Sequence, residues 1–146
     1  MIELNEQQKR ILGSWVLESG NGPEFDRYLQ EIGIPAFARM IANSTFPKFY
    51  VTLEGEEWTV KMESSFKSDQ WKFKLGQKFT QRTVDGREFW CVVELTEDGK
   101  IIETQSNAEG STNVPSTITR WVDDEGKMHA QSKANDIQCE RIFVRI

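Results

Sequence analysis

Residues 56–75 read EEWTVKMESSFKSDQWKFKL, and the fold can be predicted outward from this stretch. Every second residue from Trp58 to Phe66 is apolar or small, and polar residues occupy the positions between them. The alternation returns after a short break, where Trp71, Phe73 and Leu75 lie on one side. Successive side chains of a β-strand point to opposite faces, so a period of two predicts strands with one face turned inward. The inward face of the first strand would carry Trp58, Val60, Met62, Ser64 and Phe66.

Turn signals divide much of the chain into segments of strand length. Glycine follows a turn-forming or strand-ending residue at 54–55, 75–76, 85–86, 98–99 and 125–126. Two of these pairs, 85–86 and 98–99, are Asp-Gly, which is a strong hairpin signal. We therefore expect about ten antiparallel strands in up-and-down order, the first of them near residues 14–18. Closing such a sheet into a barrel removes its unpaired edges, so the predicted fold class is an all-β barrel.

Two helices are predicted between the first and second strands, over about residues 25–44. Phe25, Tyr28, Leu29 and Ile32 follow the i, i+3, i+4, i+7 spacing of an amphipathic helix. Gly33 would end this helix, and Pro35 fits the first turn of a second one. The second helix would carry Phe37, Met40 and Ile41 on one side. The pair is interpreted as a helix-turn-helix that covers a core.

The bulk composition indicates one soluble domain over residues 1–146. The net charge is −5, which argues against a general nucleic-acid-binding protein. The first residues lack a basic start followed by an apolar segment, and no apolar run reaches the length of a membrane span, so we expect a cytosolic protein. Cys91 and Cys139 have no metal-binding spacing and are expected to be reduced, buried thiols.

Two arginines occupy inward positions of apolar strands. Arg120 shares its face with Ile118 and Val122, and Arg141 lies between Cys139 and Phe143 at strand spacing. An unpaired buried guanidinium costs several kcal/mol and cannot lose its proton, so each needs a carboxylate, water or an anionic ligand. Glu103 is a candidate internal partner, and an outward orientation of either arginine is the other alternative. Inward Ser64 and Ser132 favour a wet cavity over a filled core.

Several segments together resemble one protein family. ESSFKSDQWKFKLGQKF (63–79) and TVDGRE (83–88) are similar to the central signature of the cytosolic fatty-acid-binding proteins, the intracellular lipid-binding proteins of the calycin superfamily. GSWVLESGNGPEFDRYLQEIGIPAFARMIA (13–42) resembles their first strand and helical lid, and CERIFVRI (139–146) their closing strand. The resemblance implies a ten-stranded barrel capped by two helices. It also implies a monomeric carrier of long-chain fatty acids or related lipids, with no cofactor and no metal.

The resemblance also implies roles for particular residues. Arg120 and Arg141 would hold the ligand carboxylate, and Phe143 stands where the family has a tyrosine, so one hydroxyl donor would be missing. The lid and portal positions would be Phe25, Tyr28, Ile34, Ala42, Phe66, Val84, Asp85 and Arg87. The cavity lining would include Met62, Ser64, Ile118, Ser132 and Cys139. The segment 106–116 is longer than the usual turn of the family.

Membranes and nuclear receptors are the further partners that the resemblance suggests. Arg27, Arg39 and Lys48 near the lid could meet an anionic membrane, although ordinary solvated surface charges are the favoured interpretation. Of the basic lid positions that the family uses for nuclear delivery, Arg39 matches, whereas Gln30 and Met40 do not.

Two other classes of function remain as alternatives to a carrier. A small hydrolase would need a base, and His129, the only histidine, alternates with Met128 and Ala130 and should point outward. The acidic turn at 123–125 does not match a calcium loop, and no zinc, P-loop or dinucleotide motif occurs. A protein-interaction module would use the barrel only as a scaffold and would have a filled interior.

Overall fold

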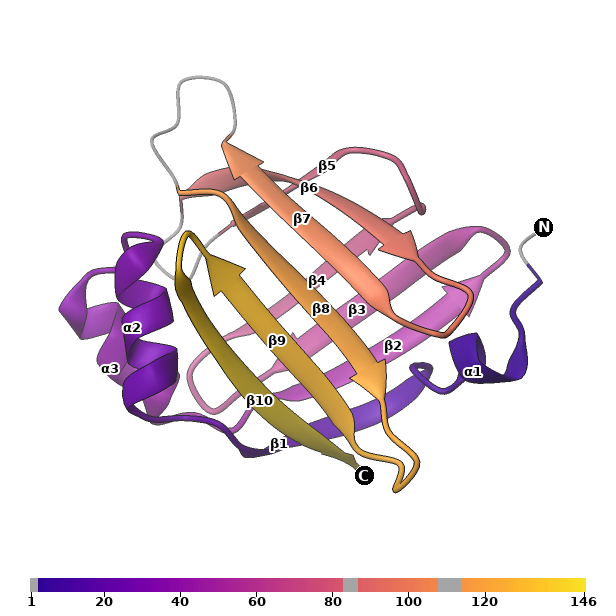
Figure 1. The fold of residues 1–146 in the computed structure, drawn as a ribbon, viewed down its shortest axis with the longest axis horizontal. Coiled ribbons are helices and arrows are strands. Elements are labelled where there is room, and N and C mark those ends of the chain that lie inside the picture. The colour runs from indigo at the N-terminus through magenta and orange to yellow at the C-terminus, as the bar shows by residue number, and fades with distance from the viewer. Residues whose placement is uncertain (1–2, 83–86, 108–113) are drawn as a thin grey trace.

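A computed structural model describes residues 3–82, 87–107 and 114–146 of the chain (Figure 1). These ranges contain three helices and ten strands. The helices are α1 (Glu6–Lys9), α2 (Pro23–Glu31) and α3 (Ala36–Asn43). The strands are β1 (Gly13–Ser19), β2 (Lys48–Glu54), β3 (Glu57–Glu63), β4 (Ser68–Phe73), β5 (Phe79–Arg82), β6 (Glu88–Leu95), β7 (Ile101–Asn107), β8 (Ser116–Val122), β9 (Met128–Ala134) and β10 (Ile137–Arg145).

The strands form one antiparallel sheet that curls into a barrel (Figure 1). Their order is β4-β3-β2-β1-β10-β9-β8-β7-β6-β5, so consecutive strands pair except β4 and β5, and β1 pairs with β10. The two ends of this order, β4 and β5, are not paired with each other. The predicted ten-stranded up-and-down barrel, with a helix-turn-helix between its first two strands, is confirmed.

The alternating pattern of residues 56–75 holds through β3 and then breaks earlier than predicted. β3 ends at Glu63, so Ser64 and Phe66 do not continue its inward face. The Ser64 hydroxyl accepts a hydrogen bond from the Lys67 backbone N–H at 2.9 Å and donates to the Lys67 carbonyl at 2.9 Å. A serine side chain that bonds local backbone groups competes with the strand ladder and favours a turn. Phe66 consequently lies on this turn with 61% of its surface exposed.

The helices α2 and α3, hereafter the lid, cover one end of the barrel (Figure 1). Phe25, Tyr28 and Leu29 of α2 are buried, as their spacing predicts. Pro35 is the N-cap of α3 in extended conformation, so its predicted place inside the first turn is wrong by one position. The predicted apolar side of α3 is wrong as well. Phe37 and Met40 face solvent with 71% and 60% exposure, because Ala38, Ile41 and Ala42 turn toward the barrel instead.

The short helix α1, which the sequence analysis did not predict, covers the opposite end of the barrel. Its N-cap is a capping box in which the Asn5 side chain accepts from the Gln8 backbone and the Gln8 side chain accepts from the Asn5 backbone. The Gln8 side chain also donates to the Thr96 carbonyl at 3.0 Å, and Asn5 donates to the Glu97 carbonyl at 2.9 Å. These bonds tie α1 to the turn between β6 and β7. We call this end the closed end.

Two clusters of buried apolar residues divide the interior. The larger cluster contains the fully buried Trp15 and Trp58 and extends to Leu4 and Ile11 beside α1. The smaller cluster lies beneath the lid and consists of Phe25, Tyr28, Leu29, Ile34, Ala134 and Cys139. The main core is therefore concentrated toward the closed end, and a separate, smaller cluster attaches the lid.

Candidate functional site

The barrel contains adjoining hollows that share Phe49 and Trp71 in their walls. The lid hollow, of about 220 Å³, is lined by Phe25, Ile41, Ala42, Thr45, Pro47, Phe49, Met62, Ser64, Phe66, Lys67, Asp69, Trp71, Gln81, Arg82 and Arg141. The β7–β8 hollow, of about 230 Å³, is lined by Tyr28, Leu29, Ile32, Ile34, Phe49, Trp71, Gln81, Arg82, Phe89, Glu103, Gln105, Ile118 and Arg120. A smaller hollow of about 40 Å³ reaches Trp58 and Phe73 toward the closed end. The barrel interior is thus largely apolar, with a few charged groups among its walls.

Arg141 brings a positive charge to the lid hollow. Its Nη2 donates to Asn21 Oδ1 at 3.2 Å, and its guanidinium lies 4.1 Å from the Phe25 ring centroid and 5.7 Å from that of Phe143. Its Nε is buried and has no hydrogen-bond partner. Among the described residues, no carboxylate lies within ion-pair range of Arg141. Burial lowers the pKa of Arg141 to about 10, which still leaves the group charged at neutral pH.

Arg120, by contrast, has an internal acid as its partner. Its Nη1 donates to Glu103 Oε1 at 3.0 Å across β8 and β7, and Glu103 is only 4% exposed. The sequence analysis left this pairing open because Ile101 and Ile102 are both apolar and hide which face of the strand is inward. The structure places Ile101 and Glu103 on the inward face. The charge of Arg120 is therefore balanced inside the barrel.

A chain of hydrogen bonds extends from this ion pair to the lid. Gln105 Nε2 donates to Glu103 Oε2 at 2.6 Å, and the Ser116 hydroxyl donates to Gln105 Oε1 at 2.8 Å. The Tyr28 hydroxyl of α2 donates to Ser116 Oγ at 3.0 Å. Burial raises the pKa of Tyr28 to about 12, so it remains a donor at neutral pH. The roles of Gln105 and Ser116 were missed, because their neighbours across the barrel and in the lid are distant in sequence.

Strand register relates the two arginines to each other. Arg120 on β8 and Arg141 on β10 both lie opposite Ala130 on the strand between them. Two strand spacings separate their backbones by about 10 Å. The side chains nevertheless have different partners, since Arg120 bonds Glu103 whereas Arg141 bonds Asn21 and stacks on Phe25. In this structure the two guanidinium groups do not share a partner.

The other predicted site residues occupy several different places. Phe143 is buried in the larger cluster, with its ring 5.5 Å from Phe49 in an edge-on arrangement. Met62 and Ser64 line the lid hollow, and Ile118 lines the β7–β8 hollow. Ser132 and Cys139 are buried opposite each other on β9 and β10, where Cys139 belongs to the cluster beneath the lid. Burial raises the pKa of the Cys139 thiol and that of the Cys91 thiol, so both favour the neutral form.

The predicted lid and portal positions are described except for Val84 and Asp85, which lie outside the described residues. Arg87 Nη2 donates to the Ile32 carbonyl at 3.1 Å and so connects the barrel to the end of α2. Phe25, Ala42 and Phe66 line the lid hollow, and Tyr28 and Ile34 line the β7–β8 hollow. The roles of all these residues in binding stay predictions.

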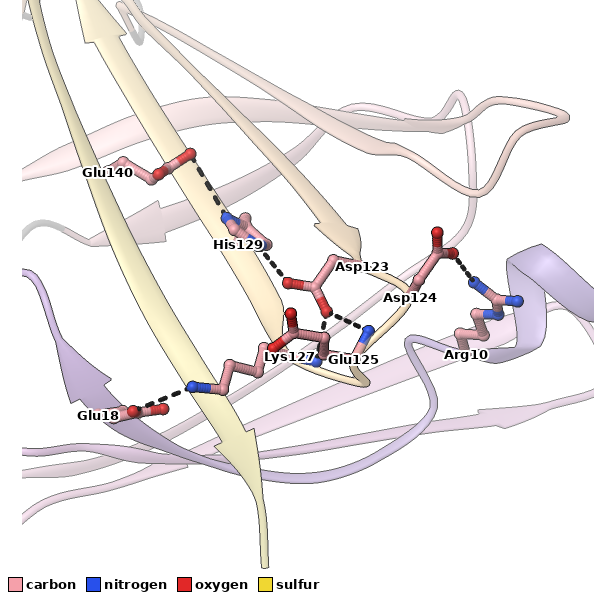
Figure 2. A network of polar contacts seen from close by, with 8 residues as sticks. All are labelled: Arg10, Glu18, Asp123, Asp124, Glu125, Lys127, His129 and Glu140. Carbon is pink, nitrogen blue, oxygen red and sulfur yellow. Dashed lines mark hydrogen bonds and ion pairs between the residues drawn. The ribbon is translucent and has the colours of Figure 1, made fainter.

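Figure 2 shows His129 on β9, between Asp123 and Glu140. Its Nε2 lies 2.7 Å from Asp123 Oδ2 and its Nδ1 lies 3.5 Å from Glu140 Oε1, while its ring stacks on Trp121 at 5.0 Å. Its neighbours along β9, Met128 and Ala130, face the core, so His129 is on the outer face. Two acids and an indole surround the imidazole, and none of them is the hydroxyl or thiol nucleophile that a Ser-His-Asp or Cys-His hydrolase uses.

The same network fastens the turn between β8 and β9 to neighbouring segments (Figure 2). Lys127 Nζ lies 3.2 Å from Glu18 of β1, and Arg10 lies 3.8 Å from Asp124. Asp123 Oδ1 accepts backbone hydrogen bonds from Glu125 and Lys127. The network therefore has a structural role on the outside of the barrel.

Known proteins are similar to this chain in both sequence and structure. No family model matches the chain. Fatty acid-binding protein 5 of Pygoscelis papua is 37% identical over 133 residues, which cover 91% of this chain and 94% of that protein. The chain belongs to the fatty acid-binding protein family. Proteins of this family are carriers and not enzymes, and this chain is accordingly not an enzyme.

Solved structures support the same assignment. Apo lipid binding protein 8 of Caenorhabditis elegans superposes with a TM-score of 0.86 at 28% identity, covering 99% of this chain and 100% of that one. A Schistosoma mansoni fatty acid binding protein in complex with arachidonic acid gives a TM-score of 0.85 at 28% identity, with coverage of 96% and 98%. The match extends over the lid as well as the barrel, since almost the whole of each chain is covered.

Two negative findings apply to residues 3–82, 87–107 and 114–146. None of their helices has the length and apolar character needed to cross a bilayer. None of their His, Cys, Asp and Glu side chains form a group of three or more that could hold a metal ion.

Proposed function

We propose that this protein carries a long-chain fatty acid, or a related hydrophobic carboxylate, in the barrel and binds its head group at Arg141. The observation that supports this most is the state of Arg141, a buried cation that has no carboxylate partner among the described residues. A ligand carboxylate would supply the missing anion through charge-assisted hydrogen bonds. We further propose that residues 1–146 act as one lipid-binding domain inside the cell.

The acyl tail would supply most of the affinity. Burial contributes about 0.8 kcal/mol per CH₂ group, and the loss of freedom on association offsets a large part of the sum. The head-group contact then sets the orientation of the ligand and excludes neutral lipids. Phe143 offers no hydroxyl, so Arg141 would hold the carboxylate with one donor fewer than an Arg-x-Tyr pair supplies. Replacing Phe143 by tyrosine should therefore strengthen carboxylate binding.

Entry would take place between α3 and the turn of residues 64–67. Ile41, Ala42 and Phe66 line the lid hollow at this place. The cluster beneath the lid is small, and elements with few buried contacts open locally at low cost. We propose that Phe66 and the lid move together to admit the tail.

Contact with a membrane during transfer fits the surface around this entrance. Phe37, Met40, Phe46 and Phe66 are all exposed there. Arg27 and Lys48 are also exposed and could meet anionic lipids. Arg39 is engaged in an ion pair with Asp26 at 3.0 Å and donates to the Ile34 carbonyl at 2.7 Å. Delivery to a nuclear receptor, which depended on Arg39 alone, is therefore left out of the proposal.

The proposal can be tested by displacement of a fluorescent fatty acid from the purified protein. A saturated fatty acid should displace the probe at one ligand per chain, and a fatty alcohol of the same length should bind more weakly. The difference between acid and alcohol should disappear in Arg141→Met, which keeps an unbranched apolar side chain and removes the charge. No displacement by any long-chain acid would overturn the proposal and would favour an interaction module instead.

A further inference from the structure

The ion pair of Glu103 and Arg120 changes the chemistry of the β7–β8 hollow. The two charges lie 3.0 Å apart and cancel locally, unlike the charge of Arg141. A ligand carboxylate placed at Arg120 would also approach the Glu103 carboxylate, and like charges at such distances repel. An anion is therefore disfavoured at Arg120 itself, although the lining of the hollow also includes Arg82 at the boundary with the lid hollow.

Hydrogen-bond donors nevertheless remain in this hollow after the internal bonds have formed. The two Glu103 oxygens accept from Arg120 and Gln105, and Gln105 Oε1 accepts from Ser116. Arg120 has five N–H groups and uses one of them in these bonds, while its side chain keeps 24% of its surface accessible. Gln105 has a second amide hydrogen beyond the one given to Glu103. The hollow thus offers N–H donors that these internal bonds do not use.

The donor groups are held in place from several sides. Glu103 fixes both Arg120 and Gln105, and the chain through Ser116 ends on the Tyr28 hydroxyl of the lid. Apolar side chains, including Phe49, Trp71 and Ile118, complete the wall of the hollow. A set of donors oriented in advance in an apolar wall favours a ligand oxygen at one position over a plain hydrocarbon chain.

We infer that Glu103, Gln105 and Arg120 form a second polar subsite, which binds a neutral oxygen on the acyl chain, such as a keto, epoxide or hydroxyl oxygen. The inference rests on the proposed function, because the ligand enters with its carboxylate at Arg141. The lid hollow and the β7–β8 hollow share Phe49, Trp71, Gln81 and Arg82, so a chain that starts in one continues into the other. The preferred cargo is then an oxygenated fatty acid rather than its unsubstituted parent.

The test compares octadecanoic acid with octadecanoic acids that carry one keto or hydroxyl group at successive positions, together with octadecanedioic acid. We expect one oxygen position to bind about tenfold tighter than the unsubstituted acid, as one charge-assisted hydrogen bond provides. We expect the diacid to bind more weakly than the monoacid. Titration calorimetry or displacement of a fluorescent fatty acid would give these ratios.

Variants then test how the charge balance of the subsite and its hydrogen-bond donors each affect ligand preference. Glu103→Gln uncovers the charge of Arg120, so it should increase diacid binding about tenfold and weaken the preference for the neutral oxygen. Glu94→Gln is the matched control, because Glu94 is exposed on β6. It should change neither the affinity for the diacid relative to the monoacid nor the preference for the oxygenated acid. The double variant Glu103→Gln with Arg120→Gln removes both charges and should show no gain for the diacid, and it also serves if the single variant fails to fold.

The outcomes distinguish this inference from the proposed function. If octadecanoic acid binds but no oxygenated isomer binds tighter, the second subsite is wrong and the carrier function stands. If Glu103→Gln leaves the affinity for octadecanedioic acid relative to octadecanoic acid unchanged, the second subsite is again wrong and the carrier function stands. If neither the plain nor the oxygenated acids bind, the proposed function fails and the subsite fails with it.

Discussion

The two ends of the barrel differ in how their apolar side chains are used. At the closed end, Trp15 and Trp58 are fully buried, and α1 is held at this end by its capping box and by the hydrogen bond from the Gln8 side chain to the Thr96 carbonyl. At the lid end, Phe37 and Phe66 are largely exposed, and a small separate cluster holds the helices to the barrel. Stability is therefore expected to come mainly from the closed end, while the lid end can open without loss of the core.

Glycine permits close backbone approaches at both ends of the barrel. Gly99, in the turn between β6 and β7, has φ +88°, and a Cβ atom there would lie 2.7 Å from the Gln7 carbonyl oxygen. Only glycine allows α1 to approach the turn so closely. A close backbone approach also occurs toward the lid end, where a Cβ atom at Gly20 (φ +115°) would lie 2.6 Å from Arg141 Cα.

The largest effect should come from the closed end. Trp15→Ala removes a fully buried indole whose Nε1 donates to the Ile11 carbonyl at 3.0 Å, and it should lower the free energy of unfolding by about 3–5 kcal/mol. Phe66→Ala at the lid end is the comparison, and an exposed side chain should change this free energy by less than about 0.5 kcal/mol. Urea unfolding followed by circular dichroism would measure both. Equal losses of unfolding free energy in the two variants would contradict the expectation that stability comes mainly from the closed end.

The next effect concerns the cation at the lid end. Arg141→Met should weaken binding of a long-chain fatty acid about tenfold to a hundredfold, because a charge-assisted contact is lost. Its free energy of unfolding should stay level or rise, since a buried cation without a carboxylate partner is removed. Lys133→Met, on the exposed side of β9, is the matched control and should alter neither quantity. Unchanged fatty-acid affinity in Arg141→Met would show that the head group lies elsewhere.

A smaller effect should follow from loosening the lid. Tyr28→Phe removes the hydroxyl that donates to Ser116, and one neutral hydrogen bond is worth about 1 kcal/mol. Ligand release should then become about fivefold faster, as stopped-flow transfer to lipid vesicles would show. Tyr50→Phe is the control, because that hydroxyl donates to Glu63 of β3 at 3.4 Å and not to a residue linked to the lid helices. If both variants release ligand at the same rate, the hydrogen bond between Tyr28 and Ser116 does not control opening of the lid.

The smallest effect should appear in acid, on the outer network. The hydrogen bond from His129 holds the pKa of Asp123 below its ordinary value of 3.8. A carboxyl with a lowered folded-state pKa stabilises the fold above the unfolded value, and this contribution is lost as the pH falls through the folded value. Asp123→Asn should therefore lose less thermal stability than the parent protein on acidification below 3.8. Asp124→Asn, which changes an exposed acid of the same turn, should follow the parent protein, and a melting series across pH would compare the three.

The sequence predicted the strands and the barrel well because alternation is a local signal that one buried face imposes. It failed where a second local preference competed, as at Ser64, whose hydroxyl ends β3 by bonding the backbone of Lys67. The side of α3 was mispredicted because Phe37 and Met40 are apolar residues that the fold leaves in solvent. The capping box of α1 was visible as Asn5 and Gln8, but a single helical turn has no apolar periodicity.

The candidate site was predictable only in part, for a different reason. Arg120 and Arg141 stand out because charged residues rarely occupy apolar strand faces. Their partners depend on register between strands and on the lid, which no short stretch of sequence encodes. The pairing of Arg120 with Glu103 and the link from Gln105 to Tyr28 through Ser116 became visible only in three dimensions.

The unpaired boundary between β4 and β5 has a consequence for the range of cargo. No ladder of backbone hydrogen bonds joins these two strands, so the circumference of the barrel is not fixed there by main-chain geometry. Side chains such as Trp71 and Gln81 border the boundary and also line the lid hollow. Small rotations of these side chains can widen the barrel without breaking a backbone hydrogen bond of the sheet. We therefore expect the barrel to accept acyl chains of different widths without disruption of the sheet.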